Sequence, residues 1–519
     1  MKLWQGIKNM FKKGGYALTG QTLKTLNDHR KVNIDPSELA RIEKSFEEYR
    51  GNHPQVEYLN SAGDLIKRDY MHLNMVKLSS ELLSGLVFNE QCEITIADES
   101  EETNALADTD AFIRHVFEHN KFKENLMRYL EPMFATGGLT VRPYVNQENG
   151  EIEFSWALSN AFYPLRSNSN GISEGVMIFV TPKVIKGEIT YYTLMEFHEW
   201  KHQQYVITNE LYKSDKKQEI GKRVPLYELD VYENLEEEVI FTGLSRPIFN
   251  YLKPAGFNNV SPHSPLGLGI TDNCRPTLKQ INDNFDQFNW EILMGQRTVF
   301  VSDAILQTRP SEDGLRPKQV FDPRTNVFKS LKMGSDQDVI KDVTSDIRTE
   351  QYTSAINQSL KTLEMQLQLT VGTFSFDGRS VKTATEITSE NSLTYRTRSS
   401  HVNEVEKFIK GIIVSSLELA KAHTLRDGKR LFNGTIPSFE HIGVDFDDGI
   451  FVDKASQLRY YGQIRLNGFM PNVEIIQRMF KVPKETAEDW IKQIQREQYI
   501  ADPIEFAQRA SEELYGEEE

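Results

Sequence analysis

Three stretches of the sequence carry a narrow apolar stripe at helical spacing, and this feature constrains the fold more than any other. The first stripe comprises Leu278, Ile281, Phe285, Phe288 and Ile292. Its intervals of three and four residues predict a helix with one apolar seam. Two further seams run through residues 349–369 and 383–423. Helices with one seam each must share a bundle or a neighbouring subunit, so the pattern favours a protruding helical hairpin in an oligomer.

The first half of the chain divides into a helical part and a strand-rich part. Asp35-Pro36 is an N-cap and first-turn pair that opens a predicted helix toward Tyr49. Further helices are expected at 71–88, where the pattern fades at Gly85, at 111–118 and at 122–134. From 139 to 242, β-branched and aromatic residues alternate with polar ones, with a turn signal at Asn170-Gly171. This alternating pattern predicts a mostly antiparallel sheet.

The segments between and after the helices that carry an apolar seam differ from them in residue composition and pattern. Residues 251–275 are rich in Gly, Pro and Ser and are interpreted as a linker or hinge. Residues 297–339 are irregular and strand-like, with several prolines. The C-terminal part contains a strand-like run at 443–450 and compact helices, most clearly at 472–480 and 484–497.

Composition limits the classes of protein to consider. The 519 residues carry a net charge of −15, from 60 basic and 75 acidic residues, whereas a free-standing DNA-binding protein usually has a basic excess. An acidic protein can still let DNA slide, because phosphate contacts create the affinity that opposes sliding. The two cysteines, Cys92 and Cys274, exclude a disulfide framework and are expected to be buried. No apolar run is long enough to span a bilayer, so we expect a protein made and used in a cytosol.

One catalytic motif is present but is rejected. His198-Glu199-Trp200-Lys201-His202 matches the H-E-x-x-H pattern of zinc metalloproteases, which requires a helix. The flanking residues are strand formers, and in a strand the two histidines would stand about 13 Å apart. We therefore expect paired surface histidines on a sheet, with no catalytic residue, cofactor or metal.

Two weaker signals are also rejected. The sequence lacks the G-x-x-x-x-G-K-[ST] loop of an ATP-driven motor. Asp445, Asp447 and Asp448 fit a solvated turn better than a divalent-cation site, because no further acidic cluster supports them.

Several segments together resemble one known family. They are Met75–Glu90, Thr193–His198, Gly372–Asp377 followed by Lys382–Ile387, Phe446–Gly449, and Asn467–Glu497. With the order of body, hinge, helix, lobe, helix, loop and long helix, they resemble the portal proteins of long-tailed bacteriophages, particularly phages of Gram-positive bacteria. The resemblance covers most of the chain.

The resemblance implies an α+β, portal-type fold, with a helical wing containing a mostly antiparallel sheet, stem helices, an α/β clip, a long helix and a helical crown. Its expected parts are the wing 1–275 (sheet 139–242, hinge 251–275), a stem helix 276–296, the clip 297–340, a strand and second stem helix 341–369, a tunnel loop 370–382, the long wing helix 383–424, and the crown with an acidic tail 425–519.

The resemblance also implies a function without bond chemistry. The chain would form a ring of about twelve copies at the unique capsid vertex of a virion, after assembly in the host cytoplasm. Its partners would be the large terminase subunit, the head–tail adaptor, the major capsid and scaffolding proteins, and double-stranded DNA passing through without sequence preference. No membrane partner is expected.

Two groups of residues are expected to carry this function. The tunnel loop would contact DNA through Phe374, Ser375, Phe376, Asp377, Arg379 and Lys382. The clip would dock the motor and adaptor through Arg309, Arg316, Lys318 and Arg324. Two alternatives stay open from the sequence: a metal-dependent hydrolase that uses the HEWKH segment, and another head–tail connector ring protein.

Overall fold

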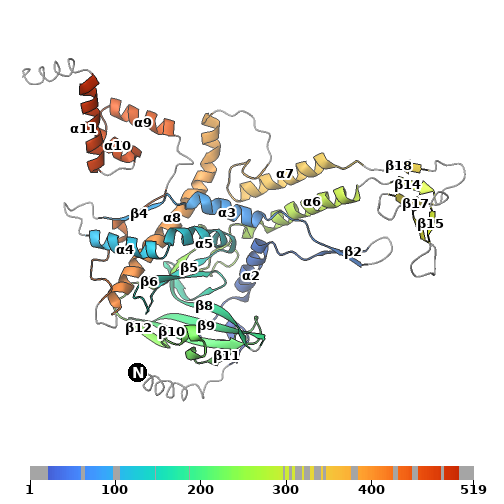
Figure 1. The fold of residues 1–519 in the computed structure, drawn as a ribbon, viewed down its shortest axis with the longest axis horizontal. Coiled ribbons are helices and arrows are strands. Elements are labelled where there is room, and N and C mark those ends of the chain that lie inside the picture. The colour runs from blue at the N-terminus through green and yellow to red at the C-terminus, as the bar shows by residue number, and fades with distance from the viewer. Residues whose placement is uncertain are drawn as a thin grey trace, which may run out of the picture. The chain divides into compact units, whose positions relative to one another are not determined.

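A computed structural model describes residues 22–501, except 60–64, 98–105, 147, 186, 296–298, 303–306, 310–317, 321–327, 332–339, 343–345, 376–383, 425–429, 447–453 and 481–483 (Figure 1). The chain divides into two compact units, residues up to Phe446 and residues from Asp447. Within the described residues, no helix is long and apolar enough to cross a membrane.

The N-terminal helices of the first unit follow the sequence prediction. They are α2 (Pro36–Arg50), α3 (Met75–Val87), α4 (Ala107–His119) and α5 (Phe122–Thr136). The Asp35 side chain accepts a hydrogen bond from the Ser37 N–H, which confirms the predicted cap of α2. Helix α3 continues beyond Gly85, where its pattern was expected to fade, because Leu83 and Val87 are buried in the main core.

The strand-rich part forms two antiparallel sheets. The larger has the order β1-β11-β10-β9-β8-β7, with β12 paired to β10, and the smaller has the order β13-β5-β6. Their bounds are β1 Thr22–Leu23, β5 Leu139–Val145, β6 Ile152–Leu158, β7 Phe162–Asn168, β8 Gly171–Ile185, β9 Glu188–Lys201, β10 Gln204–Ser214, β11 Gly221–Val224, β12 Glu238–Phe241 and β13 Asn250–Leu252. The turn predicted at Asn170-Gly171 joins β7 to β8.

The 39-residue helix α8 (Ala384–Ala422) crosses the main core (Figure 1). Its seam residues Val405, Ile409 and Ile412 are buried within the chain. The seam of this helix is therefore covered by α3, β5 and β13 of the same chain and needs no neighbouring subunit.

Helices α6 (Arg275–Met294) and α7 (Thr349–Gln366) pack together as an antiparallel pair that extends from the rest of the unit (Figure 1). Near the body their seams are buried, as at Ile281 and Leu363. Farther out, Ile292 is 43% exposed. Among the described residues, this outer part of the predicted seam is the exposed part.

The lobe between α6 and α7 consists of strands in its described residues. These are β14 (Val299–Ser302), β15 (Gln307–Arg309), β16 (Lys318–Val320), β17 (Phe328–Leu331) and β18 (Ile340–Asp342). Strand β14 pairs in parallel with β17 and antiparallel with β18, and β15 pairs with β16.

The compact C-terminal unit begins later than residue 425. Strand β19 (Ile442–Asp445) pairs with β4 (Glu93–Ile96), and Phe432 packs against Phe112, so these residues belong to the first unit. The second unit contains α9 (Lys454–Leu466), α10 (Asn472–Phe480) and α11 (Lys484–Ala501). The last two confirm the helices predicted there. The acidic tail lies outside the described residues.

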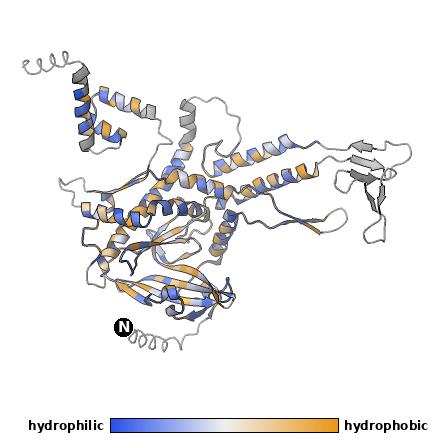
Figure 2. Ribbon diagram, in the orientation of Figure 1, coloured by the Kyte–Doolittle hydropathy of each residue, from blue (hydrophilic) through white to orange (hydrophobic). Residues whose placement is uncertain are grey.

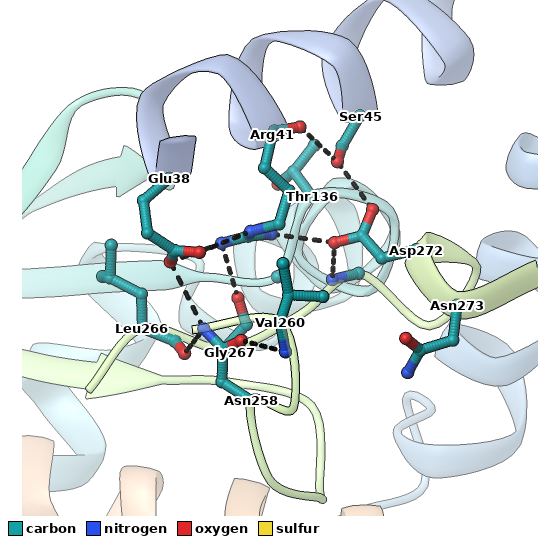
Figure 3. A network of polar contacts seen from close by, with 12 residues as sticks. Glu38, Arg41, Ser45, Thr136, Asn258, Val260, Leu266, Gly267, Asp272 and Asn273 are labelled. Carbon is teal, nitrogen blue, oxygen red and sulfur yellow. Dashed lines mark hydrogen bonds and ion pairs between the residues drawn. The ribbon is translucent and has the colours of Figure 1, made fainter. Parts of the chain in front are cut away.

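A buried charge network ties the stretch 251–275 to α2 (Figure 3). Arg41 donates to Glu38 at 3.1 Å, to Asp272 at 2.8 Å and to the Gly267 carbonyl at 3.0 Å. Asp272 also accepts from Ser45 at 2.8 Å and from the Gly269 N–H at 2.9 Å. This network holds the loop immediately before α6, and so sets where that helix leaves the body.

Candidate functional site

The α7–α8 junction, where the sequence predicts a tunnel loop, begins with a tight helix ending. Gln368 has a φ of 56°, in the left-handed region that favours glycine. The Leu369 N–H donates to the Glu364 carbonyl at 2.8 Å, and the Gln368 N–H donates to the Met365 carbonyl at 3.1 Å. This is the hydrogen-bond pattern of a Schellman ending. Leu369 is buried, so its burial compensates for the backbone strain at Gln368.

A buried carboxylate organises the described part of the loop. The Glu364 side chain, fully buried on α7, accepts hydrogen bonds from the Gly372 N–H at 3.0 Å, the Ser375 N–H at 2.7 Å, the Ser375 hydroxyl at 3.0 Å and the Phe374 N–H. Hydrogen bonds to an ionised acceptor are stronger than neutral ones. Glu364 therefore fixes residues 372–375 as a turn folded over the end of α7.

Glu364 was not among the residues predicted from the sequence, although a signal was present. Glu364 lies four residues after Leu360 and three before Leu367, inside the apolar arc of α7. An acid at such a position is buried with the seam and needs donors close by. The N–H groups of a following turn are suitable donors.

Two threonines of α8 fix the start of the loop. The Thr394 hydroxyl accepts from the Thr370 N–H at 2.9 Å, and the Thr397 hydroxyl donates to the Gln368 carbonyl at 2.8 Å. The loop is thus held between α7 and α8 before it reaches residue 376.

The predicted loop residues fall into two groups. Phe374 packs, partly buried, against the main core of its own chain, and Ser375 is buried beside Glu364. Phe376, Asp377, Arg379 and Lys382 lie outside the described residues.

Of the four predicted clip cations, the structure describes the backbone of two. Arg309 ends β15 and Lys318 begins β16, where they are paired in register. The two cations are therefore register partners across one strand pair, although they are nine positions apart in the sequence. Arg316 and Arg324 lie outside the described residues.

The HEWKH segment lies on a strand and a turn, as predicted, but its histidines are not both on the surface. His198, in β9, is fully buried, and its ring nitrogens pair with the Tyr205 hydroxyl at 2.9 Å and with Glu196 Oε1 at 2.7 Å. Burial lowers the pKa of His198, against the opposing effect of Glu196. His202 is exposed, in a turn with a φ of 48°.

The expectation of paired surface histidines is thus wrong for His198, because the HEWKH end of β9 is covered by Phe249. Both ring nitrogens of His198 already have protein partners, so this segment does not present the zinc-binding geometry of the protease motif. Among the described residues, no group of three or more His, Cys, Asp or Glu side chains is placed to hold a metal ion.

Two solved chains are similar to this chain over most of its length, with TM-scores of 0.40 and 0.39 and 11% sequence identity each. The first, from "Neck of empty GTA particle computed with C6 symmetry", covers 86% of this chain and 94% of its own length. The second, from "Virion of native gene transfer agent (GTA) particle", covers 85% and 93%.

The comparison with curated proteins gave no match. The family model described as "Phage portal protein, SPP1 Gp6-like" matches residues 28–499, which include both sheets except strand β1, the α6–α7 pair, the loop and α8. This family is a structural component of phage particles, with a portal or connector role. The chain belongs to the SPP1 Gp6-like family of phage portal proteins.

Proposed function

We propose that the chain is the subunit of a closed ring of about twelve copies, through which double-stranded DNA enters and leaves a phage head. The observation that carries this proposal is the family match across residues 28–499. The same match favours a portal over another connector ring protein, and the partners of His198 argue against a zinc hydrolase.

The α6–α7 pair supports a channel function. Helix α6 has 20 residues, which corresponds to about 30 Å of helix. Between Gln351 and Gln366, the only charged side chains of α7 are Lys361, which is half-buried, and Glu364, which is buried. Because α7 is nearly uncharged on all its exposed sides over this length, the side that faces the channel offers DNA few phosphate contacts and few repulsive carboxylates, so sliding meets a low barrier. This scarcity of charge was not among the features predicted from the sequence.

The loop after α7 would be the narrowest part of the channel. Glu364, Thr394 and Thr397 fix its first residues, so its second half would project from a rigid base. There Arg379 and Lys382 would touch phosphates without the many contacts that make binding tight. The lobe at 297–340 would dock the large terminase subunit and later the head–tail adaptor, while the outer body would meet the capsid and scaffolding proteins.

A deletion tests the proposed role of the loop. Removing residues 374–378 should leave rings and heads assembled but abolish DNA packaging, and Arg379→Ala should alter packaging or retention. Lys217→Ala, which removes an exposed cation of the β10–β11 turn, is the matched control and should package normally. Full-length DNA in heads built from the deletion variant would contradict the role of the loop.

A double charge reversal tests the docking lobe. Arg316→Glu with Lys318→Glu should weaken terminase binding while rings remain intact, measured by co-sedimentation of purified rings with the motor. Unchanged motor affinity would refute the assignment of the lobe.

A further inference from the structure

A two-stranded hairpin packs along α6 and leaves one face uncovered. It consists of β2 (Val56–Leu59) and β3 (Leu65–Arg68), and within the described residues neither strand has a second partner strand. Arg68 holds it to α6 through paired hydrogen bonds to Asp286, both at 2.6 Å, and lies over the Trp290 ring. Tyr58 also contacts the Trp290 ring. One face of the hairpin is therefore fixed on α6.

The outward face of the hairpin combines exposed leucines with one ion pair and carries no net charge. Leu59 and Leu65, which are register partners, are 69% and 57% exposed. The other pair on this face, Glu57 and Lys67, forms an ion pair at 2.7 Å. Leu293 and Met294, at the end of α6, are exposed as well. Exposed aliphatic side chains grouped in this way are typical of a protein interface.

Helix α7 packs on the opposite side of α6. Phe288 contacts the Tyr352 ring, and Glu291 accepts hydrogen bonds from Arg348 at the start of α7. Viewed along the axis of α6, the position of Phe288 is rotated by about 200° from that of Asp286, whereas Trp290 is rotated by only about 40°. Phe288 therefore lies on the opposite side of the helix from Asp286 and Trp290. Figure 1 shows the same order, with α6 between α7 and β2.

The outward face of α7 is also uncharged. Its exposed residues include Gln351, Ser354, Ala355 and Gln358, which are small or carry neutral amides. Figure 2 shows that these helices carry mixed polar and apolar residues along their length. The small side chains allow close approach by another surface, and the amides impose no charge on it.

We infer that in the ring the outward face of the β2–β3 hairpin of one subunit packs against the outward face of α7 in the next subunit. A closed ring is a head-to-tail assembly and needs two different matching surfaces on opposite sides of each subunit. The two faces point away from α6 on opposite sides. Neither carries a net charge, although the whole chain has a net charge of −15. The inference rests on the proposed ring and identifies its subunit contact.

Cysteine cross-linking of the full chain tests the inference. The native Cys92 and Cys274 are buried, so Leu65→Cys with Ser354→Cys provides the reactive pair. Treatment of assembled rings with a short bismaleimide should give a ladder of covalent multimers. The control pair, Leu65→Cys with Gln287→Cys, joins the hairpin to a residue on α6 outside both faces and should give no ladder.

Native mass spectrometry of the same samples separates the two claims. Rings without a ladder from the Leu65–Ser354 pair would overturn the inferred contact, whereas monomers alone would overturn the proposed ring. A charge swap gives an independent readout. Leu65→Glu with Ser354→Glu should lower the ring fraction about tenfold through like-charge repulsion, and Leu65→Lys with Ser354→Glu should restore it. Equal assembly of both double variants would overturn the inference.

Discussion

Replacing Glu364 by Gln should release the described part of the loop without unfolding the body. The amide keeps one acceptor oxygen, which can serve the Phe374 and Ser375 N–H groups. Its NH₂ group would then face the Gly372 N–H, so one buried donor loses its charged acceptor and meets another donor. The loop loses one hydrogen bond to a charged group, and a partial rearrangement of the loop offsets some of this loss. We therefore expect the anchored loop to be destabilised by about 2 kcal/mol.

Hydrogen–deuterium exchange measures this effect locally. A loss of about 2 kcal/mol corresponds to roughly 30-fold faster exchange at the amides of Gly372, Phe374 and Ser375. Exchange in the centre of α8 should be unchanged. Glu350→Gln, an exposed acid in the first turn of the same helix, is the control and should alter none of these amides. Unchanged exchange at all three loop amides in Glu364→Gln would refute the anchoring role.

Three further perturbations test other buried polar groups. Burial raises the pKa of Glu210, but hydrogen bonds from His29 and Tyr212 and the charge of Arg223 outweigh it and lower the pKa to about 2. The Glu210 carboxylate should contribute its full stabilisation above the pKa that it has in the unfolded chain, and should lose it as the pH falls toward 2. The urea midpoint of unfolding should therefore fall less steeply on acidification in Glu210→Gln than in the unchanged protein. Asp272→Ala should cost about 2–3 kcal/mol, because Arg41 keeps Glu38 but the Gly269 N–H loses its charged acceptor and Arg41 loses one of its two, and equal thermal stability would contradict the network. His198→Ala should lower stability by about 1–3 kcal/mol with no change in zinc content by elemental analysis.

The sequence predicts the helices and strands well where a local pattern determines them. The Asp35 cap, the 3–4 spacing of the α6 seam and the Asn170-Gly171 turn each depend on residues close in the chain, and each is confirmed. The seam of α8 was interpreted correctly as helical, but the sequence did not show which segments cover it. Whether a stripe is buried by its own chain or by a neighbour depends on contacts between distant segments, which periodicity does not encode.

The candidate site shows the same limit. Its location between two long helices was evident from the sequence, whereas its organising residue, Glu364, was not. Its role depends on a three-dimensional coincidence, because its carboxylate meets the N–H groups of residues eight to eleven positions later. His198 is the opposite case. Its HEWKH motif matches that of a zinc site, but its partners, Glu196 and Tyr205, give it a structural role.

Electron microscopy of the purified 519-residue chain tests whether it forms a DNA channel. We expect closed rings of about twelve subunits, with the α6–α7 pairs around a central channel and the loop after α7 at its narrowest point. A chain that remains monomeric at high concentration and within assembled heads would contradict the proposed portal ring, as would rings in which this helical pair faces away from the channel.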